Sequence, residues 1–236
     1  MTELLLVVAV SAVAATVQAT TGSGLTLVAA PALVVVDDAF LPAPILIAGV
    51  VIASRHAIVE RSHINRSAIV RALAILPFGM GVGWAARAAL SPAATDIAIG
   101  GTICITAAVL LTGRSPRRVP ATELAGGFAG GLAGILAGLP GPPLVLALSD
   151  LKPAALRSTT SVFILAVAVL TVVSLTVAGD FGTHELELTL LLAPGIAFGL
   201  IAGRHLRPQL DKRWFRTAVL VLSFAAGFAL ILSRAI

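Results

Sequence analysis

Long apolar runs separated by short connections make up almost the whole chain, and the connections hold nearly all of the charged residues. A helix needs roughly 20 apolar residues to cross the hydrocarbon core of a membrane, and most of the runs approach that length. The alternating pattern of a membrane β-barrel is absent from the sequence, and a lone strand cannot satisfy its backbone groups in lipid, so we predict a helix for each run. The runs are residues 4–19, 25–36, 41–54, 68–86, 97–111, 124–139, 142–148, 158–178, 188–202 and 217–233.

Two stretches are too long to be one helix. Residues 4–36 carry no charge, and these 33 residues would extend about 50 Å as a single helix, well beyond the ~30 Å core. The sequence Thr-Thr-Gly-Ser-Gly interrupts them at residues 20–24, here called the first tip. Residues 123–151 are interrupted by Gly-Leu-Pro-Gly-Pro-Pro at residues 138–143, the second tip. Because Gly and Pro break helices, we predict that each stretch forms two short helices that meet at its tip.

The order of the runs indicates an internal duplication. The two tips lie about 118 residues apart in a chain of 236, and three longer runs follow each tip. We therefore predict a first repeat, residues 1–118, with a hairpin at 4–36 and three helices. The second repeat, residues 119–236, has a hairpin at 123–151 and three helices. Glycines that recur through residues 126–138 predict close packing of that helix against a neighbour.

The distribution of charge predicts how the repeats lie in the membrane. If each broken stretch enters and leaves on the same face, 14 of the 16 Lys and Arg residues fall on one face and 2 on the other. If each stretch crossed once, they would divide almost evenly, against the positive-inside bias. We therefore predict two re-entrant hairpins and six crossings, with both termini outside. The second repeat then starts on the opposite face from the first, and such inverted repeats with broken helices are typical of secondary transporters.

Composition narrows the class of protein. The chain is 58% apolar and 11% charged, against roughly 25% charged in a soluble domain, so we predict an all-α polytopic membrane protein. The net charge is +5, but there is no Tyr and the basic residues lie in the short connections between apolar runs, which argues against nucleic-acid binding. The single cysteine, Cys104, and four histidines beside connections suggest no metal cluster and no catalytic triad. We expect no metal, no cofactor and no enzymatic activity.

The two tips carry the candidate binding chemistry. Helices that begin there would direct unpaired N–H groups and the positive ends of their dipoles into the membrane, where a bound anion would find donors. Two alternatives stay open: an unwound segment also offers carbonyls to a cation, and a Gly/Pro break can be a purely structural kink. The candidate substrate-binding residues are Thr20, Thr21, Gly22, Ser23, Gly24, Gly138, Leu139 and Gly141, with Thr159 and Thr160 as further candidates.

Thr159 and Thr160 belong to a run of four hydroxyl residues, 158–161, that follows Arg157. Four hydroxyls in lipid suggest a face turned toward protein or water, and N-capping with helix packing is the structural alternative. Arg157 itself is interpreted as an anchor at the cytoplasmic face.

Several of these motifs together resemble a known family. They are the break at residues 21–24 followed by an apolar run with Pro31, the glycine-rich helix 126–138 leading into residues 139–144, and the sequence Leu-Arg-Ser-Thr-Thr at 156–160. In these features the chain resembles the sulfite exporter TauE/SafE family of membrane anion permeases over nearly its whole length. The first break departs from the family pattern, because Thr and Ser stand where a run of glycines is usual. The resemblance implies export of small sulfur-containing anions such as sulfite or organosulfonates.

We therefore predict a secondary transporter that exports a small anion by alternating access around a site near the membrane midplane, where the two tips meet. An anion channel with the same site is the first alternative, and a membrane-embedded enzyme or scaffold protein is the second. The expected location is the cytoplasmic membrane of a bacterium or archaeon. The expected partners are a small anionic substrate and the lipid bilayer, with a homo-oligomer left open.

Overall fold

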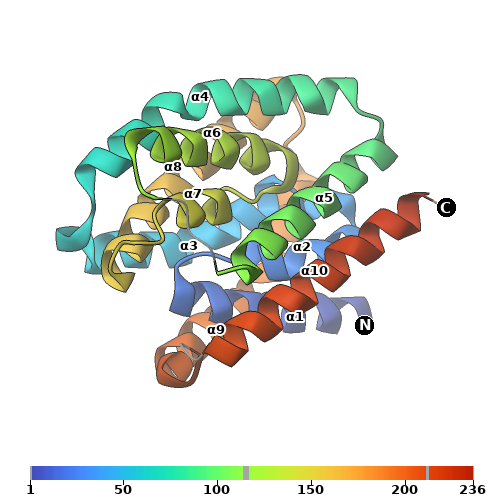
Figure 1. Ribbon diagram of the computed structural model, residues 1–236. Coiled ribbons are helices and arrows are strands. Elements are labelled where there is room, and N and C mark those ends of the chain that lie inside the picture. The colour runs from blue at the N-terminus through green and yellow to red at the C-terminus, as the bar shows by residue number, and fades with distance from the viewer. Residues whose placement is uncertain (1, 114–116, 211–212, 236) are drawn as a thin grey trace.

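The computed structural model describes residues 2–113, 117–210 and 213–235, and within these ranges it is helical with no strand (Figure 1). Short 3-10 helices at Asp38–Phe40 and Arg61–His63 lie in two of the connections. The α-helices are α1 (Thr2–Thr21), α2 (Leu25–Val36), α3 (Ala43–Val59), α4 (Arg66–Ala89), α5 (Pro92–Leu111), α6 (Pro120–Ala137), α7 (Gly141–Ala147), α8 (Pro153–Ala178), α9 (Thr183–Leu210) and α10 (Arg213–Ala235).

Six stretches of the described helices are long and apolar enough to cross a membrane. They are Glu3–Thr21, Asp38–Val59, Arg66–Ala89, Ala93–Leu111, Pro153–Ala178 and Thr183–Gly203. Large apolar side chains such as Val177 (84% exposed) and Phe78 (67% exposed) point outward from these helices, as lipid-facing residues do. The all-helical, multi-pass membrane class predicted from the sequence is confirmed.

The six helices that are long enough to span are not the same six that the sequence predicts to cross the membrane. The N-terminal helix is among them, whereas the last predicted crossing appears as the shorter apolar helix Thr217–Ser233. The breaks themselves lie where they were predicted, because α1 ends at Thr21 and α6 ends at Ala137. The expectation of two short helices in the first stretch is wrong for α1, which has 20 residues and extends about 30 Å. The partner helices are short: α2 has 12 residues and α7 has 7.

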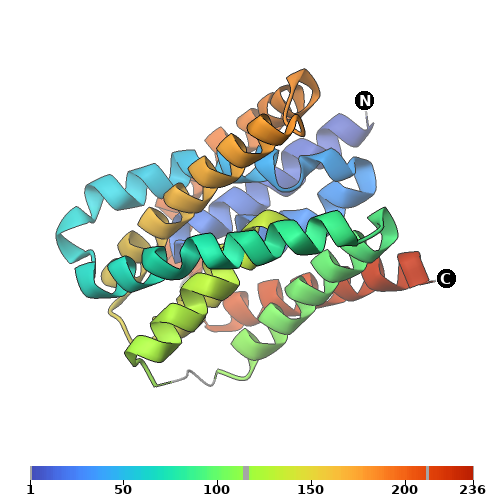
Figure 2. The same ribbon diagram turned by 90° about the horizontal axis from the view of Figure 1, so that it is seen from above.

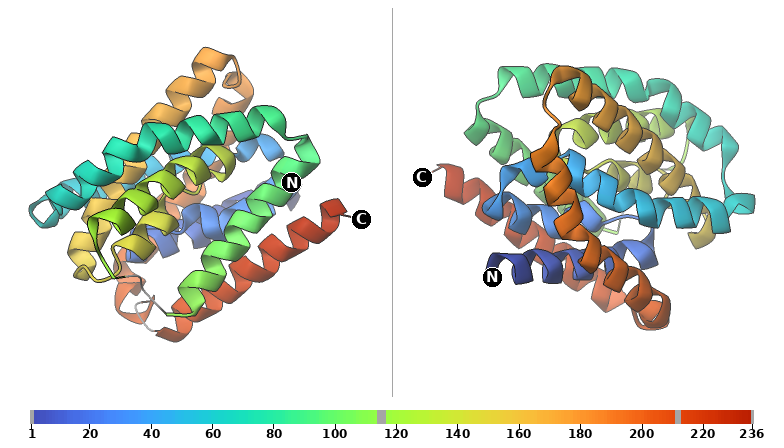
Figure 3. Two further views of the ribbon diagram at one scale, coloured as in Figure 1. Left: turned by 45° about the horizontal axis from the view of Figure 1, so that its top comes forward. Right: turned by 180° about the vertical axis from the view of Figure 1, so that it is seen from behind.

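The helices pack in matched pairs. Helix α4 packs along α6, and α9 packs along α1 in the same manner, while α5 lies against α10 and α3 against α8 (Figures 1 and 3). The five helices α1–α5 correspond in order to the five helices α6–α10. Under this correspondence the pair α4–α6 becomes the pair α9–α1, and the pairs α5–α10 and α3–α8 each correspond to themselves. The two halves of the chain therefore make equivalent contacts with one another.

Glycines bring the backbones of two of these pairs close together. A Cβ atom on Gly127 of α6 would lie 2.5 Å from the carbonyl oxygen of Ala72 on α4, and one on Gly203 of α9 would lie 2.7 Å from the Cβ of Ala19 on α1. Small residues at such crossings allow the helix–helix packing that holds membrane bundles together. The close packing predicted for the glycine-rich helix is confirmed. At its start the carboxylate of Glu123, 2% exposed, pairs with Arg71 of α4.

The connections gather at two ends of the bundle (Figure 2). One end, here called the basic end, holds the α3–α4 and α7–α8 connections. Arg61 and Lys152 belong to these connections, and Arg118 is joined to the second of them by its salt bridge to Asp150. The opposite end, the acidic end, holds the α2–α3, α4–α5 and α8–α9 connections, with Asp38 and Asp180, and both chain termini lie near it. The first tip therefore points toward the basic end, and the second tip points toward the acidic end.

Candidate functional site

The two broken segments contact each other inside the bundle. The Oγ1 hydroxyl of Thr26, in the first turn of α2, donates a hydrogen bond of 2.5 Å to the carbonyl oxygen of Gly138. A Cβ atom added to Gly141 would lie only 2.9 Å from the Cβ of Ser23. The structure thus brings Ser23 and Gly24 of the first tip together with Gly138, Leu139 and Gly141 of the second.

Little room remains where these residues meet. A space of about 20 Å³ lies between them, lined also by Gln18 and Thr26. A buried water needs a comparable volume, so the central contact between the tips is closed to anything larger. Gln18 stabilises the first tip across this space, because its Oε1 accepts a hydrogen bond of 3.1 Å from the N–H of Leu25, which begins α2.

A larger cavity opens on the basic-end side of this contact. Its volume is about 460 Å³, within the usual range for small-molecule sites. The polar groups of its wall come from the first tip, from the end of α7 and from the start of α8; they are Thr20, Thr21, Ser23, Gly24, Ser149 and Arg157. Four of the candidate residues predicted from the sequence therefore line this cavity, while Gly138, Leu139 and Gly141 line the small central space.

The hydrogen bonds of the first tip distinguish its hydroxyl groups. Thr20 and Thr21 donate to the carbonyl oxygen of Val17, at 2.8 and 2.9 Å, so their hydrogens already serve the last turn of α1. The hydroxyl of Ser23 has no hydrogen-bond partner among the described residues. Ser23 is therefore the tip hydroxyl that a ligand can reach without breaking an internal bond.

The N–H groups of the second tip are largely occupied. Gly138 adopts a left-handed conformation (φ 61°), which glycine reaches without strain, and its N–H donates to the carbonyl oxygen of Gly134 at 3.1 Å. The N–H of Leu139 donates to the carbonyl oxygen of Ala133 at 3.1 Å, which completes a typical C-terminal cap of α6. Pro140, Pro142 and Pro143 have no N–H and the second tip has no hydroxyl, so the N–H of Gly141 is the donor that this tip can offer a ligand.

Arg157 is a candidate functional residue that the sequence reading assigned to an anchoring role. Its side chain is 9% exposed, it lines the basic-end cavity, and its Nη2 and Nε atoms donate to the carboxylate of Glu60 at 2.6 and 3.2 Å. Gly22 makes room for it: a Cβ atom there would lie 2.6 Å from the Cγ of Arg157, and the positive φ of Gly22 (87°) also favours glycine. The hydroxyl-rich sequence after Arg157 indicates a polar face of the helix. It gives no indication of the partner, because Glu60 lies 97 residues away in the sequence.

One face of α8 continues from Arg157 toward the second tip. Arg157, Thr160, Ser161 and Ile164 share it, because residues three, four and seven apart lie on one side of a helix. Arg157 lies beside Gly22 and Ile164 lies beside Gly141, so this face of α8 extends from the first tip to the second. The Oγ atoms of Thr160 and Ser161 are buried and have no hydrogen-bond partner. Thr159 points elsewhere, and its hydroxyl accepts a hydrogen bond of 2.9 Å from the N–H of Asn65 in the α3–α4 connection.

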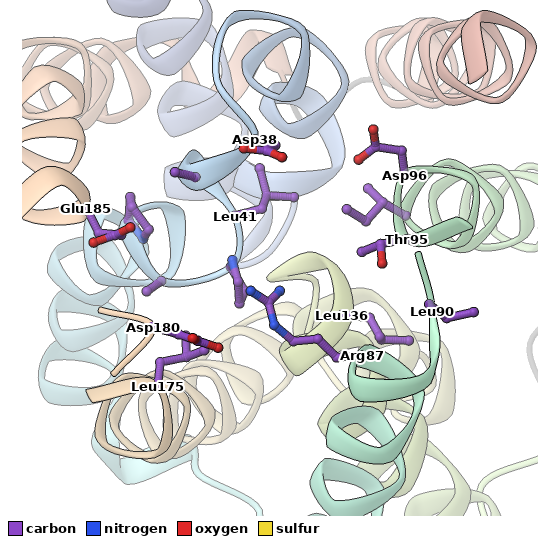
Figure 4. Close-up of a pocket in the computed structure, with 15 residues that line it drawn as sticks. Asp38, Leu41, Arg87, Leu90, Thr95, Asp96, Leu136, Leu175, Asp180 and Glu185 are labelled. Carbon is purple, nitrogen blue, oxygen red and sulfur yellow. The ribbon is translucent and has the colours of Figure 1, made fainter. Parts of the chain in front are cut away.

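A second cavity, of about 330 Å³, opens at the acidic end (Figure 4). Arg87 extends into it, and the carboxylates of Asp38, Asp96, Asp180 and Glu185 lie around the arginine. Leu136 and Leu175 line the cavity beside them. None of the candidate residues predicted at the tips lines this cavity.

These features define a class of protein: a multi-pass helical membrane protein in which two broken segments meet between polar cavities at opposite ends. The comparison with known families identifies the class further. Residues 7–230 match the sequence model of the family described as sulfite exporter TauE/SafE, and the chain belongs to that family of membrane transporters. No significant match was found among curated proteins or solved structures.

Proposed function

We propose that this chain is a secondary transporter that exports a small sulfur-containing anion, such as sulfite or an organosulfonate, by alternating access. The observation that carries the proposal is the basic-end cavity, in which a buried arginine faces the first tip, with its free Ser23 hydroxyl. Charge-assisted hydrogen bonds from a guanidinium are well suited to an oxyanion. Membership of the family supports the same class of substrate.

The matched helix pairs support a duplicated architecture. In the proposal, residues 1–118 and 119–236 are inverted repeats, and each begins with a re-entrant segment (α1–α2 and α6–α7). The concentration of Lys and Arg supports a cytoplasmic position for the basic end, by the positive-inside rule. In the proposal both termini lie outside the cytoplasmic membrane of a bacterium or archaeon, and the basic-end cavity is the one that substrate enters from the cytoplasm.

We place the anion between Ser23 and Gly24 of the first tip, Arg157, and the buried hydroxyl of Thr160. The N-terminus of α2, with the positive end of its dipole, points into the same region. Thr20 and Thr21 contribute to this site only if they release the carbonyl of Val17. The closed central contact favours a transporter over a channel, because among the described residues a space of only about 20 Å³ lies where the two tips meet.

The acidic-end cavity has the opposite electrostatic character. Its four carboxylates outnumber the single Arg87, so an anion is held less strongly there than beside Arg157. In the proposed mechanism the substrate therefore binds from the basic end and is readily released at the acidic end.

The proposal is tested with purified protein in liposomes loaded with sulfite or methanesulfonate. We expect saturable uptake of the labelled anion that is accelerated by unlabelled anion on the other side. A channel gives no such counterflow, and an enzyme or scaffold protein gives no uptake, so either result would overturn the proposal.

The role of Arg157 is tested by Arg157→Gln, which keeps hydrogen-bonding capacity and removes the charge. Arg118→Gln is the matched control, because Arg118 also pairs with a carboxylate, that of Asp150 at 2.9 Å, but lies outside the cavity. We expect at least a tenfold loss of transport for Arg157→Gln and wild-type transport for Arg118→Gln. Equal transport by both variants would remove Arg157 from the site.

A further inference from the structure

The charge of Arg157 is already neutralised in this structure. Two hydrogen bonds join its guanidinium to both carboxylate oxygens of Glu60, at 2.6 and 3.2 Å, and the two side chains are 9% and 14% exposed. Such a fork-to-fork arrangement is the strong form of the arginine–carboxylate pair. An anion that enters the cavity therefore meets an arginine whose counter-ion is in place.

A second negative charge beside Arg157 would face the carboxylate of Glu60 in a largely buried setting. Like charges at short distance repel strongly where water is excluded. The conflict is removed if Glu60 moves away or if it takes up a proton.

The surroundings of Glu60 favour uptake of a proton by its carboxylate over displacement of the carboxylate from Arg157. Its N–H donates to the carbonyl of His56 at 3.0 Å, and its own carbonyl accepts from the N–H of His63 at 2.9 Å. The connection that follows is tied to α8 by the hydrogen bond between Asn65 and Thr159. The backbone of Glu60 is thus fixed on both sides, so its carboxylate leaves Arg157 only by rotation about its own side-chain bonds, with the loss of both hydrogen bonds.

We propose that Glu60 binds one proton when an anion binds beside Arg157, so that anion and proton are taken up together. This inference rests on the proposed function. The balance is simple: the carboxylate becomes a carboxylic acid, the guanidinium N–H groups turn from Glu60 to the anion, and a monovalent anion with its proton leaves the net charge of the site unchanged. Linkage then requires that each ligand raises the affinity for the other by the same factor.

Other charged and titratable groups face Glu60 and must be distinguished from it. His56 precedes it on α3; the Nε2 of His56 lies 3.1 Å from the carbonyl oxygen of Ala19, and its buried Nδ1 has no partner. Arg55 lies on α3, Arg61 and His63 belong to the adjoining 3-10 helix, Lys152 is the N-cap of α8, and Arg157 belongs to α8. On α9, His205 is exposed at the same end, while the side chains of Arg204 and Arg207 lie outside the described part of the chain. His56 is therefore the main competing proton acceptor.

The test is calorimetric titration of the purified protein with methanesulfonate in buffers of different ionisation enthalpy, which counts the protons taken up per anion. A sulfonate stays ionised throughout, so any proton binds to the protein. We expect about one proton per anion, and an affinity that falls about tenfold per pH unit once Glu60 is ionised in the free protein. Glu60→Gln should bind the anion with no proton uptake and little dependence on pH.

The matched control is Glu123→Gln. Glu123 is also a buried carboxylate paired with an arginine, but it lies outside the cavity, so this variant should keep the proton uptake of the wild type. Anion binding without proton uptake in the wild type, or an unchanged proton count in Glu60→Gln, would overturn the inference and leave the proposed function standing. No binding by the wild type at any pH would instead overturn the proposed function. If Glu60→Gln does not fold, His56→Gln decides: proton uptake that persists in this variant assigns the proton to Glu60, and loss of the uptake would overturn the inference.

Discussion

The contact between the two tips can be tested with a single added carbon. A Cβ atom on Gly141 would lie 2.9 Å from the Cβ of Ser23 and 3.3 Å from the Cδ1 of Ile164. Carbon atoms pack best at about 3.5–4.0 Å, so the tips must separate by roughly 0.6–1 Å. Both Cβ atoms are fixed to their backbones, and no rotation of a side chain relieves the contact.

Overpacking of this kind costs about 1–3 kcal/mol, which corresponds to roughly a 5- to 150-fold change in an equilibrium constant. We therefore expect Gly141→Ala to lower transport about tenfold. Gly141→Leu, which also fills the central space of about 20 Å³, should abolish transport while the protein still inserts. Transport is measured by counterflow in liposomes and normalised to the amount of inserted protein.

Two further variants separate a local wedge from general damage. Gly101 on α5 has no neighbour within 4 Å of an added Cβ atom, so Gly101→Leu should transport as the wild type does. Ser23→Gly removes the atom that clashes, and the double variant with Gly141→Ala should regain the melting temperature that Gly141→Ala loses. Wild-type transport by Gly141→Leu would refute the proposed role of the tip contact.

Three other predictions follow from the same contacts. Thr160→Val removes a buried hydroxyl without a partner, so we expect the melting temperature to hold or rise while transport falls; a loss of stability with transport intact would assign Thr160 a structural role. Thr26→Val breaks the hydrogen bond to Gly138 and should lower the free energy of unfolding by about 1 kcal/mol, whereas Thr26→Ser should not, as thermal melts in detergent would show. In a Cys104→Ala background, Asp38→Cys and Arg61→Cys should react with impermeant thiol reagents from opposite sides of the membrane, and labelling from the same side would refute the proposed orientation.

The sequence was sufficient to predict the helices, their breaks and the glycine-mediated packing. These features are local: apolar length decides whether a helix spans, and Gly or Pro decides where it stops. The wrong expectation that α1 is a short helix also comes from a local signal. Thr20 and Thr21 were read with the break, but their hydroxyls bond back to Val17 and extend α1 to Thr21.

The charged part of the candidate site could not be predicted from the sequence. Arg157 and Glu60 each stand near a connection, where a basic or acidic residue is usually an anchor, and they become a buried pair only when α3 packs against α8. The positive-inside rule considers only the sign of each charge and the connection in which it lies. It carries no information about which residues pair across the bundle. The tertiary fold supplies that information.

The two tips, which occupy equivalent places in the two halves, differ in chemistry. The first has a free hydroxyl on Ser23, faces the larger cavity and begins a 12-residue helix. The second has prolines in place of donors, uses the N–H groups of Gly138 and Leu139 to cap α6, and begins a 7-residue helix. In the proposed mechanism the two halves therefore have different roles. The first tip binds the anion, and the second tip holds the first tip in position through the contacts of Thr26 and Gly141. In the proposed architecture, duplication accounts for the matched helix pairs, whereas the proposed binding site depends on the residues by which the halves differ.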